Sequence, residues 1–423
     1  MGVIGFGTVG MGTVKVLWNQ KEEIEKELGV GIKVVTIVDK EWALERPLVV
    51  PPDIKSVNPA DILENPEIEI VVEAIGGIEP AFDFVSQALS RGKTVVTPNK
   101  ELIAKKGREL FQIAAQNETE IFFEGAVGGG IPIIHSLKEQ LLGDDILEVI
   151  GIVNGTTNFI LSEMSTKHTS FEKALEEAKK KGYAEPVPTN DVEGFDAAYK
   201  ITILASLCFH GRVEVEKVFR EGITRILPED IEYARELGYV IKLLAIARRW
   251  KEGIELRVQP VLLTSTHPLS TVNGVENAIF VHSKTRELTF RGPGAGGDAT
   301  GSAMVGDIID AIRNIKFEAK GRVGCTCMRD LVVVPVENLS TQFCVRVLAF
   351  DVPGVLGKIA TEFGSAGVSL SAVKQPVSTP GKLTYIYFLT HQVQEYKLAE
   401  SVENIKKLEV VKDAYAIRVE DGQ

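Results

Sequence analysis

Apolar and polar positions follow two alternating periods along the first third of the chain. Short β-branched runs predict strands, at residues 33–38, 68–74, 94–97 and 121–123. Helical periodicity lies between them, at residues 11–28, 80–91 and 100–116. Strands that alternate with helices are typical of a parallel sheet built from βαβ units. Because ligands bind beyond the carboxyl ends of such strands, the pattern predicts a binding site at that edge of the sheet.

The middle and the end of the chain have different patterns. In the middle, helices are predicted over 171–181, 194–210 and 228–251, and strands over 254–263, 278–282 and 287–290. The end reads β-α-β-β-α-β, with strands over 343–349, 368–373, 385–389 and 410–418 and helices over 354–366 and 394–408. This order is typical of a small ferredoxin-like module.

The predicted fold class is α/β, with three domains. We expect a Rossmann-type dinucleotide-binding domain over 1–127, to which a helix at 298–316 returns. An α+β catalytic and dimerisation domain is expected over 128–297, a linker over 317–338, and the ferredoxin-like domain over 339–423. A length of 423 residues agrees with several domains.

Charge and cysteine content exclude several function classes. A net charge of −11 argues against non-specific binding to nucleic acids. The sequence contains no run of eighteen or more apolar residues, so we expect no membrane span. We also expect no signal peptide. Four cysteines in the chain suit a reducing cytoplasm.

A GxGxxG run lies at Gly5–Gly10, directly after a short apolar stretch. In a βαβ unit, Gly5 allows a tight turn, Gly7 allows close approach of a pyrophosphate, and Gly10 allows close packing of helix on strand. The alternative is a chance cluster of glycines. Because the strand before the loop is short, we expect a version extended upstream to bind cofactor more tightly or to be more stable.

Two polar residues follow other predicted strands. Asp39 ends the second strand, where an acid suits the ribose hydroxyls of NAD and repels the extra phosphate of NADP, unless Lys40 or Arg46 compensates. Lys100 follows a strand and Pro98-Asn99, where it can anchor cofactor or substrate. The alternatives are an acid in a surface turn and a solvated lysine.

A charge pair precedes a helix that is apolar nearly all round. Asp196 and Lys200 are spaced i and i+4, so they share one helix face. The following run ITILASLCF predicts burial. A surface ion pair is the alternative, but a charge pair at the start of a buried helix is costly without a purpose. We therefore interpret Asp196 and Lys200 as an acid–base device.

Another loop lies near the end of the chain, between the first strand and first helix of the ferredoxin-like module. Asp351, Gly354 and Leu356 surround a predicted helix N-terminus, whose free N–H groups suit the carboxylate of an amino acid. The alternative is a plain structural turn.

Together, these motifs resemble homoserine dehydrogenases in their monofunctional form with a C-terminal ACT domain. The resemblance covers nearly the whole chain, and we expect no aspartokinase region. It rests on GFGTVG at 5–10, EAIGG at 73–77, TPNKELIA at 97–104, EGAVGGGIPII at 124–134, GIVNGTTNFIL at 151–161, DVEGFDAAYK at 191–200, HPLSTV at 267–272 and GPGAGGDAT at 292–300.

The resemblance implies reversible reduction of L-aspartate 4-semialdehyde to L-homoserine by NAD(P)H, in the biosynthesis of threonine, methionine and isoleucine. Lys200 would be the proton donor, and Asp196 and Glu185 would hold the amino and hydroxyl ends of the substrate. Lys100 would contact both cofactor and substrate. Gly155 and Thr156 would approach the substrate carboxylate.

The resemblance also implies a cofactor site and a monovalent-cation site. The cofactor residues would be Gly5, Phe6, Gly7, Thr8, Val9, Gly10, Asp39, Gly76, Thr97, Lys100, Gly182 and Gly296. Na+ would be bound mostly by backbone carbonyls of Glu124, Val127, Gly129 and Ile131. Relatives often carry Arg where Val38 precedes Asp39, so this chain is expected to use NAD or both cofactors.

The implied ACT domain predicts pairing of chains and binding of an amino acid. L-threonine is the expected effector, at Asp351, Gly354 and Leu356, and the expected assembly is a homodimer or homotetramer. Two other functions are the alternatives. A phosphoglycerate-type dehydrogenase with an ACT domain would need a catalytic His–acid pair and a substrate-binding Arg, and a non-catalytic amino-acid sensor would have lost Lys200 or the glycine loop.

Overall fold

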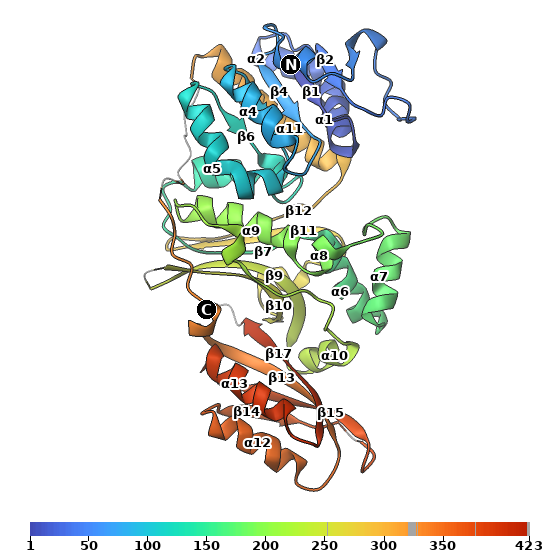
Figure 1. The fold of residues 1–423 in the computed structure, drawn as a ribbon, viewed down its shortest axis with the longest axis vertical. Helices are drawn as coiled ribbons and strands as arrows, with labels where there is room; N and C mark the ends of the chain where they lie inside the picture. The colour runs from blue at the N-terminus through green and yellow to red at the C-terminus, as the bar shows by residue number, and fades with distance from the viewer. Residues whose placement is uncertain (252, 320–326, 328, 377, 421–423) are drawn as a thin grey trace. The chain divides into compact units, whose positions relative to one another are not determined.

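The computed structural model describes residues 1–251, 253–319, 327, 329–376 and 378–420, in two compact units (Figure 1). The first unit comprises Met1–Gly155, Asp196–Val218 and Val275–Leu331, and the second comprises Thr156–Phe195, Phe219–Gly274 and Val332–Gln423. Part of the expected linker, at 320–326 and 328, lies outside the described residues. Among the described residues, no helix combines the length and the apolar character needed to cross a membrane.

A six-stranded parallel sheet forms the centre of the first unit, in the order β3-β2-β1-β4-β5-β6. Its strands are β1 (Gly2–Ile4), β2 (Thr36–Val38), β3 (Lys55–Ser56), β4 (Ile70–Glu73), β5 (Thr94–Val96) and β6 (Ile121–Phe122). This order is that of dinucleotide-binding sheets, and it reverses between β1 and β4. The predicted parallel sheet is thus confirmed, and the switch point lies where the glycine loop follows β1.

Helices of the first unit include one that returns from late in the chain. They are α1 (Thr8–Asn19), α2 (Lys21–Leu28), α3 (Ala60–Leu63), α4 (Ala81–Ser90), α5 (Lys100–Gln116) and α11 (Gly297–Lys316). The expected helix over 11–28 is instead two helices that meet at Gln20. Figure 1 shows α11 beside α1, and a Cβ on Gly12 would lie only 2.0 Å from the Gly297 carbonyl oxygen. Glycines therefore let the late helix pack closely on the first.

A smaller antiparallel sheet and a buried helix complete the first unit. The sheet pairs β7 (Ile146–Ile152) with β11 (Glu276–Ser283), and β11 with β12 (Glu287–Pro293). Strand β7 was not expected from the sequence. Helix α9 (Phe195–Cys208) is buried on almost every side from Asp196 onward, as its apolar run predicts.

In the second unit, strands from the middle and the end of the chain form one sheet, in the order β9-β10-β17-β13-β15-β14. They are β9 (Tyr239–Trp250), β10 (Gly253–Thr264), β13 (Ser340–Phe350), β14 (Leu370–Lys374), β15 (Leu383–Thr390) and β17 (Val411–Glu420), with β8 (Phe219–Arg220) beside β10 and β16 (Val393–Gln394) beside β13. The link is a parallel pairing of Val261–Leu263 with Arg418–Glu420. The C-terminal strands therefore continue the sheet of the middle segment.

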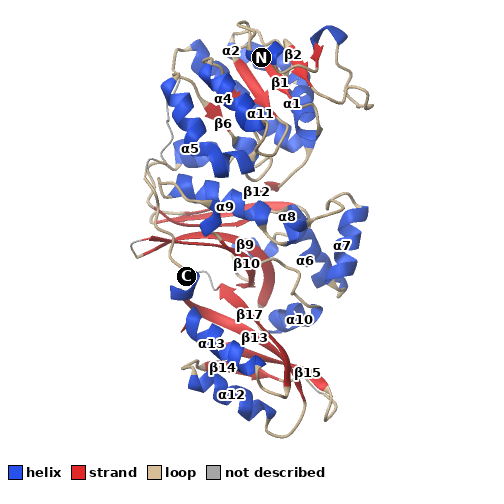
Figure 2. Cartoon of the chain, in the orientation of Figure 1, coloured by secondary structure: helices blue, strands red, loops and turns tan. Residues whose placement is uncertain are grey.

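The helices of the second unit are α6 (Gly155–Lys167), α7 (Phe171–Lys180), α8 (Thr189–Val192), α10 (Pro228–Glu236), α12 (Val355–Ser365) and α13 (Glu395–Lys406). The C-terminal elements follow the predicted β-α-β-β-α-β order, apart from the short β16. Figure 2 shows α12 and α13 on one face of these strands, where Ile359, Phe363 and Ile405 pack on Val345 and Val347.

The predicted helix over 228–251 is wrong beyond its first turns. Helix α10 ends at Glu236, and Gly238 adopts a left-handed φ of +81°. The rest of the stretch is β9, which pairs with β10 from Tyr239 to Trp250. A strand with apolar residues on both faces reads as a continuous apolar run, which periodicity cannot distinguish from a buried helix.

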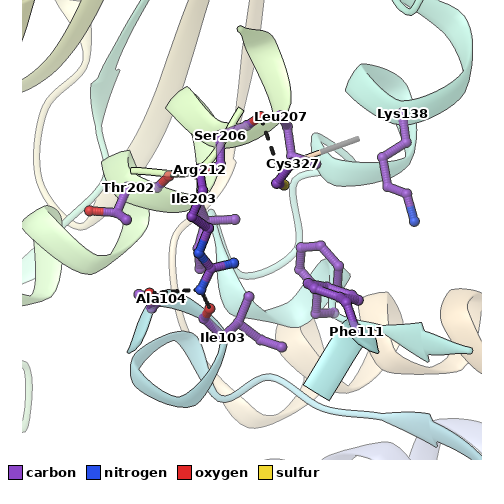
Figure 3. Close-up of a pocket in the computed structure, with 11 residues that line it drawn as sticks. Ile103, Ala104, Phe111, Lys138, Thr202, Ile203, Ser206, Leu207, Arg212 and Cys327 are labelled. Carbon is purple, nitrogen blue, oxygen red and sulfur yellow. Dashed lines mark hydrogen bonds between the residues drawn. The ribbon is translucent and has the colours of Figure 1, made fainter. Parts of the chain in front are cut away.

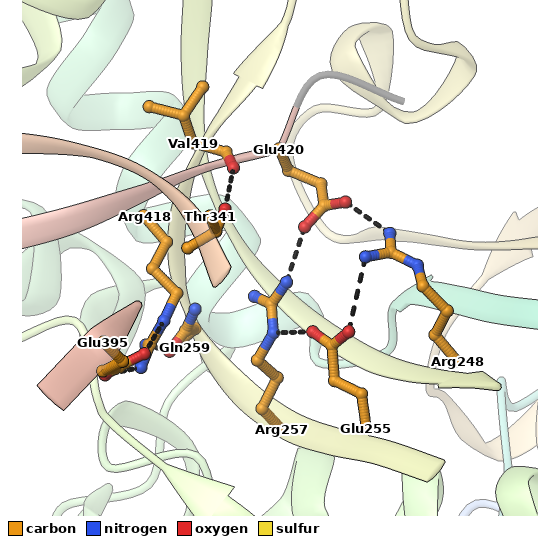
Figure 4. A network of polar contacts seen from close by, with 9 residues as sticks. All are labelled: Arg248, Glu255, Arg257, Gln259, Thr341, Glu395, Arg418, Val419 and Glu420. Atoms are coloured by element: carbon orange, nitrogen blue, oxygen red, sulfur yellow. Dashed lines mark hydrogen bonds and ion pairs between the residues drawn. The ribbon is translucent and has the colours of Figure 1, made fainter. Parts of the chain in front are cut away.

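A charge network joins β17 to the hairpin of β9 and β10 (Figure 4). Arg257 donates to Glu255 and, at 2.6 Å, to Glu420, while Arg248 pairs with both carboxylates. Burial alone would raise the pKa of Glu420, but Arg248 and Arg257 outweigh it and lower this pKa to about 2. The network therefore holds the last strand by ionised groups inside the unit.

Candidate active site

The glycine loop has the shape that a pyrophosphate needs. Gly5 has φ +96°, and a Cβ there would lie 2.6 Å from the Ala74 carbonyl oxygen. A Cβ on Gly10 would lie 2.0 Å from the Gly5 carbonyl oxygen, whereas one on Gly7 would meet nothing within 4 Å. Packing therefore requires the first and third glycines, and the second faces open space. Since α1 begins at Thr8, its free N–H groups can bind phosphate oxygens there.

Other predicted cofactor residues lie near this loop or at the same edge of the sheet. A Cβ on Gly297 would lie 2.8 Å from the Thr8 carbonyl oxygen, so the neighbouring Gly296 borders the loop. Thr97 follows β5 at the same edge of the sheet. The Phe6 side chain is buried in the apolar core of this unit, and the partly exposed Val9 packs against that core. Phe6 can therefore meet a cofactor only through its backbone.

Asp39 organises the glycine loop. Its Oδ2 accepts a hydrogen bond from the Phe6 N–H (2.7 Å), and its Oδ1 accepts from the Glu41 N–H (2.7 Å) and from Arg46 (2.8 Å). Burial raises the pKa of Asp39, but these donors outweigh it and lower the pKa. The Arg46 guanidinium lies over the rings of Phe6 and Trp42, at 5.5 and 5.3 Å from their centroids. A cation thus sits beside the acid that would otherwise repel a ribose phosphate.

Two lysines from different elements meet at one carboxylate. Lys200 Nζ donates to Asp196 Oδ2 (2.7 Å) and to the Val153 carbonyl (2.6 Å). Lys100 Nζ lies 3.0 Å from Asp196 Oδ1, and the Asn154 amide donates to Oδ2 (2.9 Å). Lys200 and Asp196 are buried, while the Lys100 side chain is 40% exposed. The buried ammonium of Lys200 and the partly exposed ammonium of Lys100 thus share one carboxylate.

Opposing effects act on the Asp196 carboxyl. Its burial raises the pKa, but Lys200, Lys100 and the Asn154 amide outweigh burial and hold the pKa well below its usual range. Asp196 is therefore an anion at any physiological pH. It serves to hold the lysines rather than to exchange protons.

The expected cation loop is held by a buried acid. Both carboxylate oxygens of Glu124 accept backbone N–H groups, from Ile134 and His135 at 2.7 Å each. Burial raises the pKa of Glu124 despite these bonds. Since the carboxylate is engaged, Glu124 can serve a cation by its backbone carbonyl. Left-handed Gly128 and Gly129 turn the chain between Val127 and Ile131, and carbonyl oxygens are donors suited to Na+.

Several predicted site residues belong to the second unit. Glu185 and Gly182 are exposed, and the Thr156 hydroxyl donates to the Tyr183 carbonyl (2.7 Å). Their roles toward Lys200, and that of Gly155 where α6 begins, stay predictions.

The expected effector loop also lies in the second unit. Asp351 accepts from Gln375 (3.0 Å) and from Ser378 (2.6 Å). Gly354, with φ +85°, precedes α12, and Leu356 is partly exposed. Asp351 thus holds the neighbouring turn, and α12 begins without a side-chain cap, although the Val355 N–H donates to the Val352 carbonyl.

A small, mainly apolar pocket lies between α5 and α9, the helices that begin with Lys100 and carry Lys200 (Figure 3). Arg212 donates to the carbonyls of Ile103 and Ala104 at 3.2 Å each. A Cβ on Gly107 would lie 2.8 Å from this guanidinium. The pocket contains no predicted site residue, and its arginine, in the segment after α9, binds carbonyls of α5.

Sequence reasoning overlooked two supporting side chains. Asn154 lies inside the quoted run at 151–161, but its amide was not singled out as a partner of Asp196. Glu73 ends β4, where an acid at the carboxyl end of a parallel strand, just before two glycines, could have drawn attention.

Comparisons with known proteins give the family. A family model described as the NAD binding domain of homoserine dehydrogenase matches residues 5–124, and a model described as homoserine dehydrogenase matches residues 132–309. The homoserine dehydrogenase of a Synechocystis species is 41% identical, over 98% of this chain and 97% of that protein. The chain belongs to the homoserine dehydrogenase family. It is therefore an NAD(P)-dependent oxidoreductase of amino-acid biosynthesis.

Solved structures agree with this assignment. The homoserine dehydrogenase of Thiobacillus denitrificans has a TM-score of 0.92 and 41% identity, covering 99% of this chain and 97% of its own. A hyperthermophilic archaeal homoserine dehydrogenase in complex with NADPH has a TM-score of 0.64 and 30% identity, covering 75% of this chain and 97% of its own.

Proposed function

We propose that the chain interconverts L-homoserine and L-aspartate 4-semialdehyde, with Lys200 as proton donor and acceptor. The observation that carries the proposal is the contact of Lys200 with Asp196, which also pairs with Lys100. The nicotinamide cofactor, when bound, gives or takes the hydride. As the aldehyde carbon gains a hydride, charge develops on its oxygen, which an ammonium can stabilise and then protonate.

The other residues bind and orient. Asp196 holds the Lys200 ammonium against the Val153 carbonyl, which limits its freedom of movement. Asp196 and Glu185 are assigned to the amino and hydroxyl ends of the substrate. Gly155 and Thr156 are assigned to its carboxylate, and Lys100 to both substrate and cofactor.

An absorbance assay tests this proposal. Homoserine and oxidised cofactor are mixed with the full chain, and NADH or NADPH is followed. Turnover that depends on homoserine supports the proposal. A protein that binds amino acids without turnover would instead be a sensor, and turnover with phosphoglycerate alone would indicate the other ACT-bearing class of dehydrogenase.

We propose that the chain accepts both cofactors and that Arg46 makes NADPH acceptable. The support is the position of Arg46, paired with Asp39 and stacked on Phe6 and Trp42. A guanidinium there can offset the negative charge of Asp39 for a ribose phosphate. Comparing kcat/KM for NADH and NADPH tests this proposal.

We also propose Na+ at the carbonyls of Glu124, Val127, Gly129 and Ile131, because left-handed Gly128 and Gly129 turn the chain between these residues and carbonyl oxygens are ligands suited to a hard cation. Bound Na+ stabilises the folded state by mass action. The melting temperature should therefore be higher in NaCl than in tetramethylammonium chloride at equal ionic strength.

The C-terminal module is proposed to be an ACT domain that binds L-threonine near Asp351, Gly354 and Leu356, in a homodimer or homotetramer located in the cytoplasm. Its β-α-β-β-α-β order and the lack of a side-chain cap at the start of α12 support this proposal. Millimolar threonine should inhibit turnover by the full chain. An unchanged rate would remove threonine as the effector and leave the module a role in assembly.

A further inference from the structure

Glu73 is a buried acid whose hydrogen-bond donors, among the described residues, are all uncharged. It is the last residue of β4, at the carboxyl edge of the parallel sheet, and its side chain has no solvent exposure. Burying a carboxylate is costly unless hydrogen bonds satisfy it. The reaction chemistry does not use Glu73, so its partners indicate what it does.

One carboxylate oxygen shapes the loop that follows β4. Oε1 accepts the backbone N–H groups of Ile75 (2.7 Å) and Gly76 (3.2 Å). Gly76 is left-handed, with φ +75°. The loop after β4 packs directly against the glycine loop. A Cβ on Gly5 would lie 2.6 Å from the Ala74 carbonyl oxygen and 2.7 Å from the Ile75 side chain. Glu73 therefore fixes the loop that packs on Gly5, the first glycine of the glycine loop.

The other oxygen reaches the next strand and the helix after it. Oε2 accepts the Thr97 hydroxyl (2.5 Å), and the Thr97 oxygen accepts the Asn99 N–H (3.0 Å). Asn99 caps α5 by accepting the Leu102 N–H (3.1 Å), and its amide donates to the Gly77 carbonyl (2.6 Å). The chain of bonds closes on the loop after β4 and ends at the helix turn that begins with Lys100.

Three donors converge on Glu73, and this is why a carboxylate is needed. A glutamine has one oxygen that accepts and one nitrogen that donates. In Glu73→Gln, either the loop N–H groups or the Thr97 hydroxyl must lose an acceptor, although the side chain keeps its size.

We propose that Glu73 is a positioning residue for the nicotinamide cofactor: it fixes the 75–77 loop and Thr97 against the glycine loop, and through Asn99 it fixes the start of α5. The inference rests on the proposed cofactor site. It adds a residue that does not touch the reacting atoms and acts through the loops that do.

Titration of cofactor binding without substrate tests the inference. NADPH and NADH are titrated into the full chain by calorimetry or nucleotide fluorescence, for wild type, Glu73→Gln and Glu148→Gln. Glu148 is a matched control, a buried acid on β7 that lies 3.7 Å from His282. Glu73→Gln should weaken binding about 10- to 100-fold, the range expected for hydrogen bonds to a charged group. Glu148→Gln should remain within about twofold of wild type.

Steady-state kinetics separate positioning from general loosening. In Glu73→Gln, the KM for cofactor should rise several-fold more than the KM for homoserine, because Asp196 and Lys200 keep their own contacts and only Lys100, at the start of α5, serves both ligands. Equal losses for cofactor and homoserine, or cofactor binding equal to that of Glu148→Gln, would overturn the inference.

A second pair of variants decides the matter if Glu73→Gln does not fold. Thr97→Val removes the hydroxyl that Glu73 binds, and Thr97→Ser keeps it. Thr97→Val should weaken cofactor binding about tenfold more than Thr97→Ser does, because only the serine keeps the hydroxyl that Glu73 accepts. Wild-type affinity in Thr97→Val would overturn the inference. A wild-type chain that binds neither nucleotide would contradict the proposed function instead.

Discussion

Replacing Asp196 with Asn tests how the lysines are held. The carboxylate lies 2.7 Å from Lys200 Nζ and 3.0 Å from Lys100 Nζ. Asparagine has nearly the same shape and no charge, so Asp196→Asn leaves two ammonium groups facing a neutral amide. Lys200 is buried, so losing the carboxylate destabilises its charge most. Solvent screens the charge of the half-exposed Lys100.

The distances set the size of the effect. At these separations and an effective dielectric of about 20, each attraction is about 6 kcal/mol before desolvation. Desolvation offsets part of it, and removing one partner from a buried pair costs about 3 to 5 kcal/mol. If that cost falls on the transition state, kcat drops between about 10² and 5 × 10³-fold.

The assay is the rate of NAD(P)H formation from homoserine, with a thermal melt of each variant. The control is Glu176→Gln on α7, which breaks an acid–lysine pair of the same i,i+4 spacing that is about two-thirds exposed. An exposed pair contributes little, so the control should remain within about twofold of wild type. A folded Asp196→Asn enzyme with kcat within about threefold of wild type would refute the reasoning.

Three further predictions concern the frame of the site and its cofactor. Folding lowers the pKa of Glu420 from its ordinary 4.5 to about 2. The ionised Glu420 therefore stabilises the folded state above pH 4.5, and this contribution is lost as the pH falls toward 2. Glu420→Gln should therefore lower the unfolding free energy at pH 7 by about 3 kcal/mol and flatten that pH dependence in urea titrations, and an unchanged midpoint would contradict it. Gly12→Ala should lower the free energy of unfolding, followed by thermal melts, by about 1 to 3 kcal/mol, because its Cβ meets Gly297. The control Gly306→Ala, whose Cβ would meet open space, should not destabilise the protein. Equal melts for the two variants would contradict the close packing of α11 on α1. Arg46→Gln should raise the KM for NADPH about tenfold more than the KM for NADH, and equal changes would remove Arg46 as the group that accommodates the phosphate.

Local patterns predicted much of the fold because they record which faces are buried. The parallel sheet follows from short apolar strands between amphipathic helices, and α9 follows from its apolar run. The pattern failed at Tyr239–Trp250, where both faces of a strand are buried. It also could not place β17 beside β10, because pairing between distant segments leaves no mark on local periodicity.

In the candidate site, too, local spacing predicted some contacts, whereas others appear only in the folded chain. The i,i+4 spacing was sufficient to predict that Asp196 and Lys200 share a helix face, and the structure confirms their contact. Lys100 was singled out for following a strand, but only the fold places it at Asp196. Glu73 and Asn154 were overlooked because an acid or amide takes its role from partners that tertiary structure brings to it.

The most direct test of the account is the turnover of Lys200→Ala, measured as NAD(P)H formation from homoserine and compared with wild type. A loss of about 10² to 10⁴-fold is expected, the usual contribution of a positioned proton donor, in a variant whose thermal melt shows that it is folded at the assay temperature. A folded Lys200→Ala enzyme whose turnover is near that of wild type would contradict the assignment of Lys200 as the group that moves the proton.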